Sequence, residues 1–143
     1  MTKTILVFLL YACSLSAQAA LDAAQVRQLA AEDSSDKVAA IRQLTQTADP
    51  DAVRVLQAMA DDSLYLAGGK AVIIDGDKAF DAATGAAIRV PADAESVTVN
   101  NRIRGELANA LAALKLFDPD AAIRLASAQK LQSSVSPAMA PLL

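Results

Sequence analysis

The clustering of glycine in one part of the chain constrains its fold more than any other feature. All five glycines lie between positions 68 and 105, and clusters of β-branched residues lie in the same region. Residues 20–62 and 100–143 instead carry apolar side chains at helical spacing in alanine-rich sequence. We therefore predict a mainly α fold with a small β insertion, in which residues 63–99 form an antiparallel ribbon flanked by helices.

Residues 21–62 are expected to form three short helices, the last two of which make an αα-hairpin. Each helix begins at a residue whose side chain or backbone angle suits a helix N-terminus. These residues are Asp22 with Gln25, Ser34 or Ser35, and Asp49 followed by Pro50. The expected apolar faces are Val38, Ile41 and Leu44 in the second helix, and Val53, Leu56 and Met59 or Ala60 in the third.

Two hairpins are expected within the ribbon. Gly68-Gly69 lies between two apolar runs, which is a strong signal for a two-residue hairpin loop. A weaker signal at Thr84-Gly85 predicts a second hairpin, and residues 97–99 are a candidate further strand. Because an isolated ribbon buries too little surface to be stable, we expect it to pack against helices on either side. The side chains available for this packing are Ile73, Tyr65 and Phe80.

The C-terminal segment predicts a long helix, a second helix and the start of a third. Asn100 or Asn101 caps the long helix, and Asp118-Pro119 ends it and begins the next. Ser136-Pro137 is expected to open the third helix. The expected apolar faces are Ile103, Leu107, Ala110, Leu111 and Leu114, and then Leu125, Ala128 and Leu131.

An internal repeat supports a helical architecture. Residues 37–56 match residues 124–143 at a constant offset of 87, which pairs Val38 with Leu125 and Leu44 with Leu131. Such a match is typical of HEAT-like helical hairpins, which stack through their apolar faces. The alternative is two unrelated alanine-rich helix pairs. Since the second copy stops within its second helix, we expect a truncated repeat.

Residues 1–19 have the features of a secretory signal peptide. Lys3 precedes a short apolar run, and small residues ending in Ala17-Gln18-Ala19 follow it. The run is shorter than the roughly 20 residues that cross a bilayer. An uncleaved anchor and a lipoprotein site at Cys13 are the alternatives, although Tyr11 is bulky for a lipobox. The prediction is export.

Composition excludes several classes of function. The chain has no histidine and one cysteine, so it cannot build a Ser-His-Asp relay, an imidazole metal site or an intramolecular disulfide. A net charge of −3 argues against nucleic acid and anionic membrane surfaces as partners. Gly68-Gly69-Lys70 lacks the spacing of a P-loop, and Asp75-Gly76-Asp77 fits a solvated turn better than an EF-hand. We predict no enzyme activity, no cofactor and no metal site.

Acidic residues gather at the expected helix ends. Carboxylates there usually cap helices and face solvent. The alternative is a contact surface for a partner that presents Lys or Arg, whose binding would weaken with salt. The candidate partner surface consists of Asp49, Asp51, Asp61, Asp62, Asp118 and Asp120. The aromatic residues Tyr65, Phe80 and Phe117 are expected to fill the core.

Three segments of the chain resemble a known family. The first segment is the signal peptide with residues 21–27. The second is the ribbon, from Leu66-Ala67-Gly68-Gly69-Lys70 through residues 72–79 and 81–85. The third is Val99-Asn100-Asn101-Arg102-Ile103-Arg104 with Glu106-Leu107. Together they resemble the N-terminal periplasmic extension of the urea ABC-transporter permease subunit, a relative of the branched-chain amino-acid permeases. The likeness spans nearly the whole chain, and the Gly-Gly ribbon with the Asn-Asn-Arg segment is its most specific part.

This resemblance implies a function without catalysis. It implies a periplasmic accessory and interaction domain that supports urea uptake, with the membrane part of the permease and the periplasmic substrate-binding protein as partners. The sequence departs from the family because no membrane-spanning stretch follows residue 19. We therefore expect a fragment of the longer subunit or a truncated gene. The alternative is a free-standing secreted HEAT-like scaffold with an unrelated protein partner.

Overall fold

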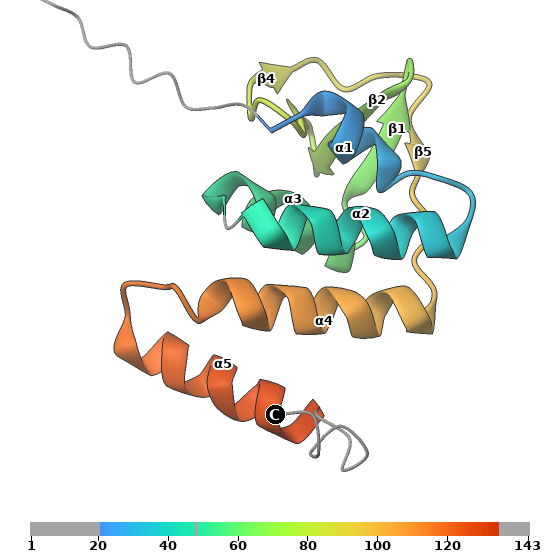
Figure 1. Ribbon diagram of the computed structural model, residues 1–143. Helices are drawn as coiled ribbons and strands as arrows, with labels where there is room; N and C mark the ends of the chain where they lie inside the picture. The colour runs from blue at the N-terminus through green and yellow to red at the C-terminus, as the bar shows by residue number, and fades with distance from the viewer. Residues whose placement is uncertain (1–20, 48, 135–143) are drawn as a thin grey trace, which may run out of the picture.

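Along the part of the chain that the structure describes, three helices precede the strands and two helices follow them. The computed structural model describes residues 21–47 and 49–134, which form a mixed α/β fold with five helices and one antiparallel sheet (Figure 1). The helices are α1 (Ala23–Gln28), α2 (Ser34–Thr47), α3 (Pro50–Ala60), α4 (Asn101–Lys115) and α5 (Ala121–Ser134). The strands are β1 (Leu64–Ala67), β2 (Lys70–Asp75), β3 (Lys78–Asp81), β4 (Ala87–Ile88) and β5 (Glu95–Ser96).

Side-chain caps fix where the helices begin. The carboxylates of Asp22 and Asp49 accept backbone N–H bonds at the starts of α1 and α3, and the amide oxygen of Asn100 does so at α4. These three caps confirm the sequence expectation. At α2 the expectation was wrong, because Asp33 is the cap and accepts the Ser35 N–H at 2.6 Å. The cap thus lies one residue before Ser34, which is already the first residue of α2.

The β insertion is a five-stranded sheet with the order β4-β3-β2-β1-β5, larger than the ribbon expected. The β1–β2 hairpin is confirmed: Gly68 and Gly69 have φ of 53° and 75°, as a type I′ turn requires. Gly76, with φ of 57°, forms a further hairpin between β2 and β3. The hairpin at Thr84-Gly85 is also confirmed, between β3 and β4.

The last strand lies earlier than expected. β5 consists of Glu95 and Ser96, whereas residues 97–99 lie outside the sheet ladder. The side chain of Val97 is buried in the main core, and its N–H donates to the Leu64 carbonyl at 3.0 Å. Val97 thus adds one backbone bond to β1 just beyond β5, and the chain then leaves the sheet to begin α4.

One face of the sheet forms the main core with the helices. Leu64, Ala71 and Ile73 pack with buried residues of α1, α2, α3 and α4, and Phe80 covers them in part. Since side chains alternate along a strand, Tyr65 points to the opposite face, where a small separate cluster of Ala67, Val72 and Ala79 lies. The expected packing on helices is confirmed for Ile73 and Phe80. The expectation was wrong for Tyr65, whose face carries a cluster without helix residues in the part of the chain that the structure describes.

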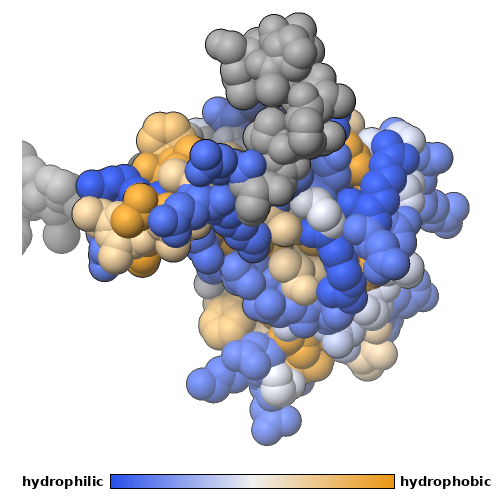
Figure 2. Space-filling view, turned by 90° about the horizontal axis from the view of Figure 1, so that it is seen from below, coloured by the Kyte–Doolittle hydropathy of each residue, from blue (hydrophilic) through white to orange (hydrophobic). Residues whose placement is uncertain are grey.

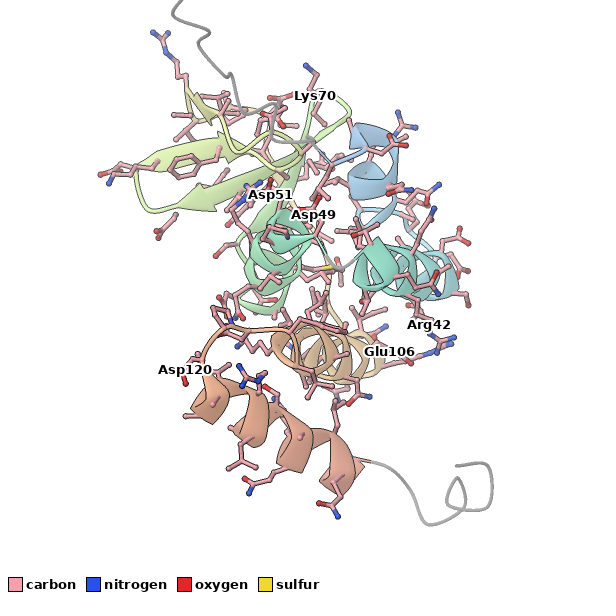
Figure 3. All side chains as sticks on the ribbon, turned by 60° about the vertical axis from the view of Figure 1, so that its left-hand side comes forward. Arg42, Asp49, Asp51, Lys70, Glu106 and Asp120 are labelled. Carbon is pink, nitrogen blue, oxygen red and sulfur yellow. The ribbon has the colours of Figure 1, made fainter. Side chains whose placement is uncertain are left out.

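The helices stack in layers, with α4 between α2 and α3 on one side and α5 on the other (Figure 1). Arg42 of α2 and Glu106 of α4 form an ion pair of 3.0 Å across this stack (Figure 3). The expected faces of α2 and α4 are confirmed, as are Leu56 and Met59 of α3. All of the following side chains are buried: Val38, Ile41, Leu44, Leu56, Met59, Ile103, Leu107, Ala110, Leu111 and Leu114.

The expected face of α5 is wrong at two of its three residues, because only Leu131 is half-buried, beside residues of α2 and α4. Ser127 is its buried residue, whereas Leu125 is 61% exposed and Ala128 is exposed. The apolar residues of α5 surround the helix instead of forming a stripe, so their spacing does not determine which side meets α4. Val38 and Leu125 thus differ in burial although the repeat aligns them. The aligned residues 135–143 lie outside the described residues, as does the signal peptide.

Candidate interaction sites

The acidic residues at the ends of α3 stabilise that helix and its neighbours. Asp49 caps α3, and the Asp51 carboxylate lies 3.3 Å from the Arg54 guanidinium. At the other end, Asp61 accepts a bond from the Gln57 amide at 3.1 Å. Asp62 forms an ion pair of 2.9 Å with Arg104 of α4. Each of these carboxylates therefore has a local structural role.

The acidic residues between α4 and α5 also act as local caps. Asp118 accepts the Asp120 N–H at 2.8 Å, and Asp120 accepts the Ala122 N–H at 2.7 Å at the start of α5. These bonds leave carboxylate oxygens available on an exposed turn, because an ionised carboxylate accepts several hydrogen bonds.

The candidate partner surface is divided over the molecule. Asp49 and Asp51 lie together at the start of α3, whereas Asp120 lies beyond α4 (Figure 3). Asp61 and Asp62 follow the last residue of α3, about 16 Å further along the helix axis. The six residues therefore do not form a single partner surface.

A different surface feature accompanies one acidic turn. Phe117, expected in the core, is 78% exposed, and Leu125 on the second turn of α5 is 61% exposed. Asp118 and Asp120 lie in the same connection. Figure 2 shows hydrophobic surface gathered at the left-hand end of the α5 layer, where α4 and α5 join. We call Phe117, Asp118, Asp120 and Leu125 the α4–α5 patch.

The Gly-Gly-Lys segment is a structural turn. The Gly68 N–H donates to the Asp93 carboxylate at 3.1 Å, and Lys70 extends from the tip of the hairpin (Figure 3). Lys70 and Arg27 line a cavity of about 440 Å³ between α1 and this hairpin. Both cations are exposed, and Asp81 also lines the cavity, so its lining carries both signs of charge.

Residues 21–47 and 49–134 present neither a cluster of metal ligands nor a membrane-spanning helix. Within these ranges, no group of three or more acidic, cysteine or histidine side chains is placed to hold a metal ion. Asp75-Gly76-Asp77 forms the end of the β2–β3 hairpin. Among the same residues no helix is both long and apolar enough to cross a membrane.

Lys37 is the one charged side chain of the described residues that is buried, with 6% of it exposed. Its Nζ donates to the Thr98 carbonyl oxygen at 2.7 Å, which ties α2 to the segment after β5. Burial disfavours the ammonium form and lowers the pKa of Lys37 from its ordinary value of 10.5. The sequence held a signal for this position, since Lys37 precedes Ile41 and Leu44 by four and seven residues on the buried stripe of α2.

A comparison of the chain with protein-family models, curated proteins and solved structures found no match. The residues, their geometry and the sequence resemblance are therefore the grounds on which a function can be inferred.

Proposed function

We propose that the chain is a non-catalytic, exported interaction domain of a urea ABC-transporter permease subunit, which supports urea uptake from the periplasm. The residues that resemble this family hold structural positions in the fold. Gly68-Gly69 makes the β1–β2 turn, Gly76 makes the β2–β3 turn, and Asn100 caps α4. These positions support the proposal because a related chain would need the same residues to build the same sheet and helix.

The α4–α5 patch is the observation that carries an interaction role. Exposed large apolar side chains that are bordered by polar groups are typical of contact sites for other proteins. Phe117 and Leu125 supply the apolar part. Beside it, Asp118 and Asp120 supply two negative charges and Arg124 one positive charge, since its guanidinium donates to the Asp118 carbonyl at 2.8 Å. A fitting partner presents an apolar pocket bordered by Lys or Arg. The proposed partners are the transporter's periplasmic substrate-binding protein and the membrane part of the permease.

The helical layers are proposed to be HEAT-like. The packing of α4 against α2 and α3 on one side and α5 on the other supports stacked helical units, as in solenoids. In such stacks the helix connections and the outer helix carry the binding surface. The α4–α5 patch lies on both of these features.

A binding titration tests this function. We expect the protein to bind the urea transporter's substrate-binding protein at low salt and more weakly at high salt, since salt screens Asp118 and Asp120. Phe117→Ser is expected to lower the affinity about tenfold, because it removes an exposed apolar anchor. Val90→Ser is the matched control, since Val90 is also an exposed apolar residue but lies near β4. Its affinity should equal that of the parent protein.

Two results would reject the proposal. No binding at low salt to either transporter component, combined with binding to an unrelated secreted protein, would favour the free-standing scaffold. Turnover of urea by the purified protein would overturn the non-catalytic role.

A further inference from the structure

The outer edge of β5 presents unpaired backbone groups. β5 is the last strand of the sheet and pairs only with β1 among the described strands. Val97 donates to Leu64, which makes these two residues a hydrogen-bonded pair. In an antiparallel ladder the residue before it, Ser96, then directs its N–H and C=O away from β1. These two groups are free to bind an added strand.

A cavity of about 330 Å³ lies against this edge. Its inner wall contains Lys37 and the apolar Leu66, and its mouth carries the exposed carboxylates of Glu32 and Glu95. The remaining lining residues are Ala30, Ala31, Ser96, Val97 and Thr98. The cavity thus combines a strand edge, an apolar wall and one interior cation.

The interior cation lacks a counter-ion in the part of the chain that the structure describes. The Thr98 carbonyl is the one acceptor bound by the Lys37 Nζ there, and no carboxylate of these residues lies within 4.0 Å of it. An ammonium group has three N–H donors. A buried charge without a partner is costly, so an arriving carboxylate gains a strong charge-assisted bond. The site therefore favours a carboxylate at Lys37.

We propose that the β5 edge binds the extended C-terminus of a partner protein, whose backbone pairs with Ser96 and whose terminal carboxylate accepts bonds from Lys37. The spacing along this edge favours a chain end over other ligands. Ser96 and Thr98 are two residues apart on one edge, so a strand paired at Ser96 reaches Lys37 beside Thr98 within about 7 Å. Strand addition and carboxylate capture are established modes of peptide recognition.

The charges at the mouth restrict the sequence of the bound chain end. Glu32 and Glu95 repel acidic residues and attract Lys or Arg placed before the terminal residue. Leu66 and the two alanines favour an apolar terminal side chain. This site is separate from the α4–α5 patch and does not depend on the transporter assignment.

Two short peptides test the proposal on the isotopically labelled protein by NMR titration. Acetyl-Lys-Ala-Leu with a free carboxylate is expected to shift the amides of Ser96 and Val97. The same peptide with a C-terminal amide is expected to bind about tenfold more weakly, because it loses the charged bond to Lys37. Lys37→Met should abolish this difference. Lys78→Met, at an exposed lysine of β3, should preserve it.

A second variant separates strand pairing from charge capture. Ser96→Pro removes the outward N–H at an edge position that tolerates proline and leaves Lys37 in place. It should weaken peptide binding at least severalfold while leaving the weak binding of acetate unchanged. The proposal is overturned if both peptides bind equally, if acetate alone binds as tightly as the free-acid peptide, or if neither peptide shifts Ser96.

Discussion

Replacing Lys37 with methionine should stabilise the folded protein. Lys37 is 6% exposed, and its ammonium group donates one hydrogen bond, to the Thr98 carbonyl, with no counter-ion among the described residues. Methionine has a similar length and is flexible enough to fill the same space. The change removes the cost of burying an ammonium group, which amounts to several kcal/mol in proteins.

The size of the expected stabilisation depends on the hydrogen bond that the substitution removes. The lost bond from a charged donor contributes about 1.5–3 kcal/mol. Thr98 is exposed, so its carbonyl can bind water in the variant and is not left unpaired. The two terms leave a net gain of about 1 kcal/mol in the free energy of unfolding near neutral pH.

The pH dependence gives a second check on the same substitution. Because burial lowers the pKa of Lys37 below 10.5, the unfolded chain binds more protons than the folded one between the lowered pKa and 10.5. The stability of the parent protein should therefore rise through this interval relative to Lys37→Met, and the advantage of the variant should shrink.

Urea denaturation followed by far-UV circular dichroism, repeated from neutral to alkaline pH, measures both effects. Lys78→Met is the control, since the loss of an exposed lysine should change stability by less than about 0.5 kcal/mol. A Lys37→Met variant that is destabilised by about 1 kcal/mol or more would refute the reasoning, because the Thr98 bond would then outweigh the burial cost. So would a stability difference that is constant across this pH range.

Further substitutions test the turns, the core and the caps by the same denaturation assay. Gly69→Ala should destabilise by about 1–2 kcal/mol, because φ of 75° suits glycine, whereas Gly105→Ala in α4 should stabilise by about 0.5–1 kcal/mol, since its Cβ meets no atom within 4 Å. Equal effects at the two glycines would contradict this. Leu107→Ala should cost about 2–5 kcal/mol, because the side chain is fully buried in the main core; a smaller loss would mean that the core collapses around the gap. Asp33→Ala should destabilise the protein at neutral pH, because it removes the cap of α2. The bond from the Ser35 N–H lowers the pKa of Asp33 below 3.8, so the stability difference between parent and variant should vanish as the pH falls from 3.8 through this lowered pKa. A stability difference that persists in acid would argue against the cap.

The helices were largely predictable because their signals are local. The caps Asp49 and Asn100 and the buried stripe of α4 depend on residues within one or two turns of each other. The Gly68-Gly69 hairpin was predictable for the same reason. The orientation of α5 was not, because a helix with apolar residues on all sides can pack in several rotations, and the tertiary contact with α4 decides among them.

The candidate sites were harder to predict because they form between distant segments. The acidic turns were visible in the sequence, but the exposure of Phe117 depends on how the α4–α5 connection turns. Lys37 and Thr98 are 61 residues apart, and no local pattern pairs an ammonium with a carbonyl of another segment. Edge strands also lack a composition signal when they are as short as β5.

Two cations join the helices to the β segment, and they change the charge that the surface presents. Arg54 of α3 donates to the Ala82 carbonyl at 3.2 Å, as Lys37 of α2 does to Thr98. The guanidinium of Arg54 lies 3.3 Å from the position that a Cβ on Gly85 would occupy, so a larger residue there would disturb this link. Arg54 also pairs with Asp51, so these two charges offset each other. Lys37 is buried, which takes one positive charge from the surface, and the outer charge is therefore slightly more acidic than the net charge of −3 suggests. A basic partner rim at the α4–α5 patch, and basic residues before the chain end at the β5 edge, follow from this same distribution of charge.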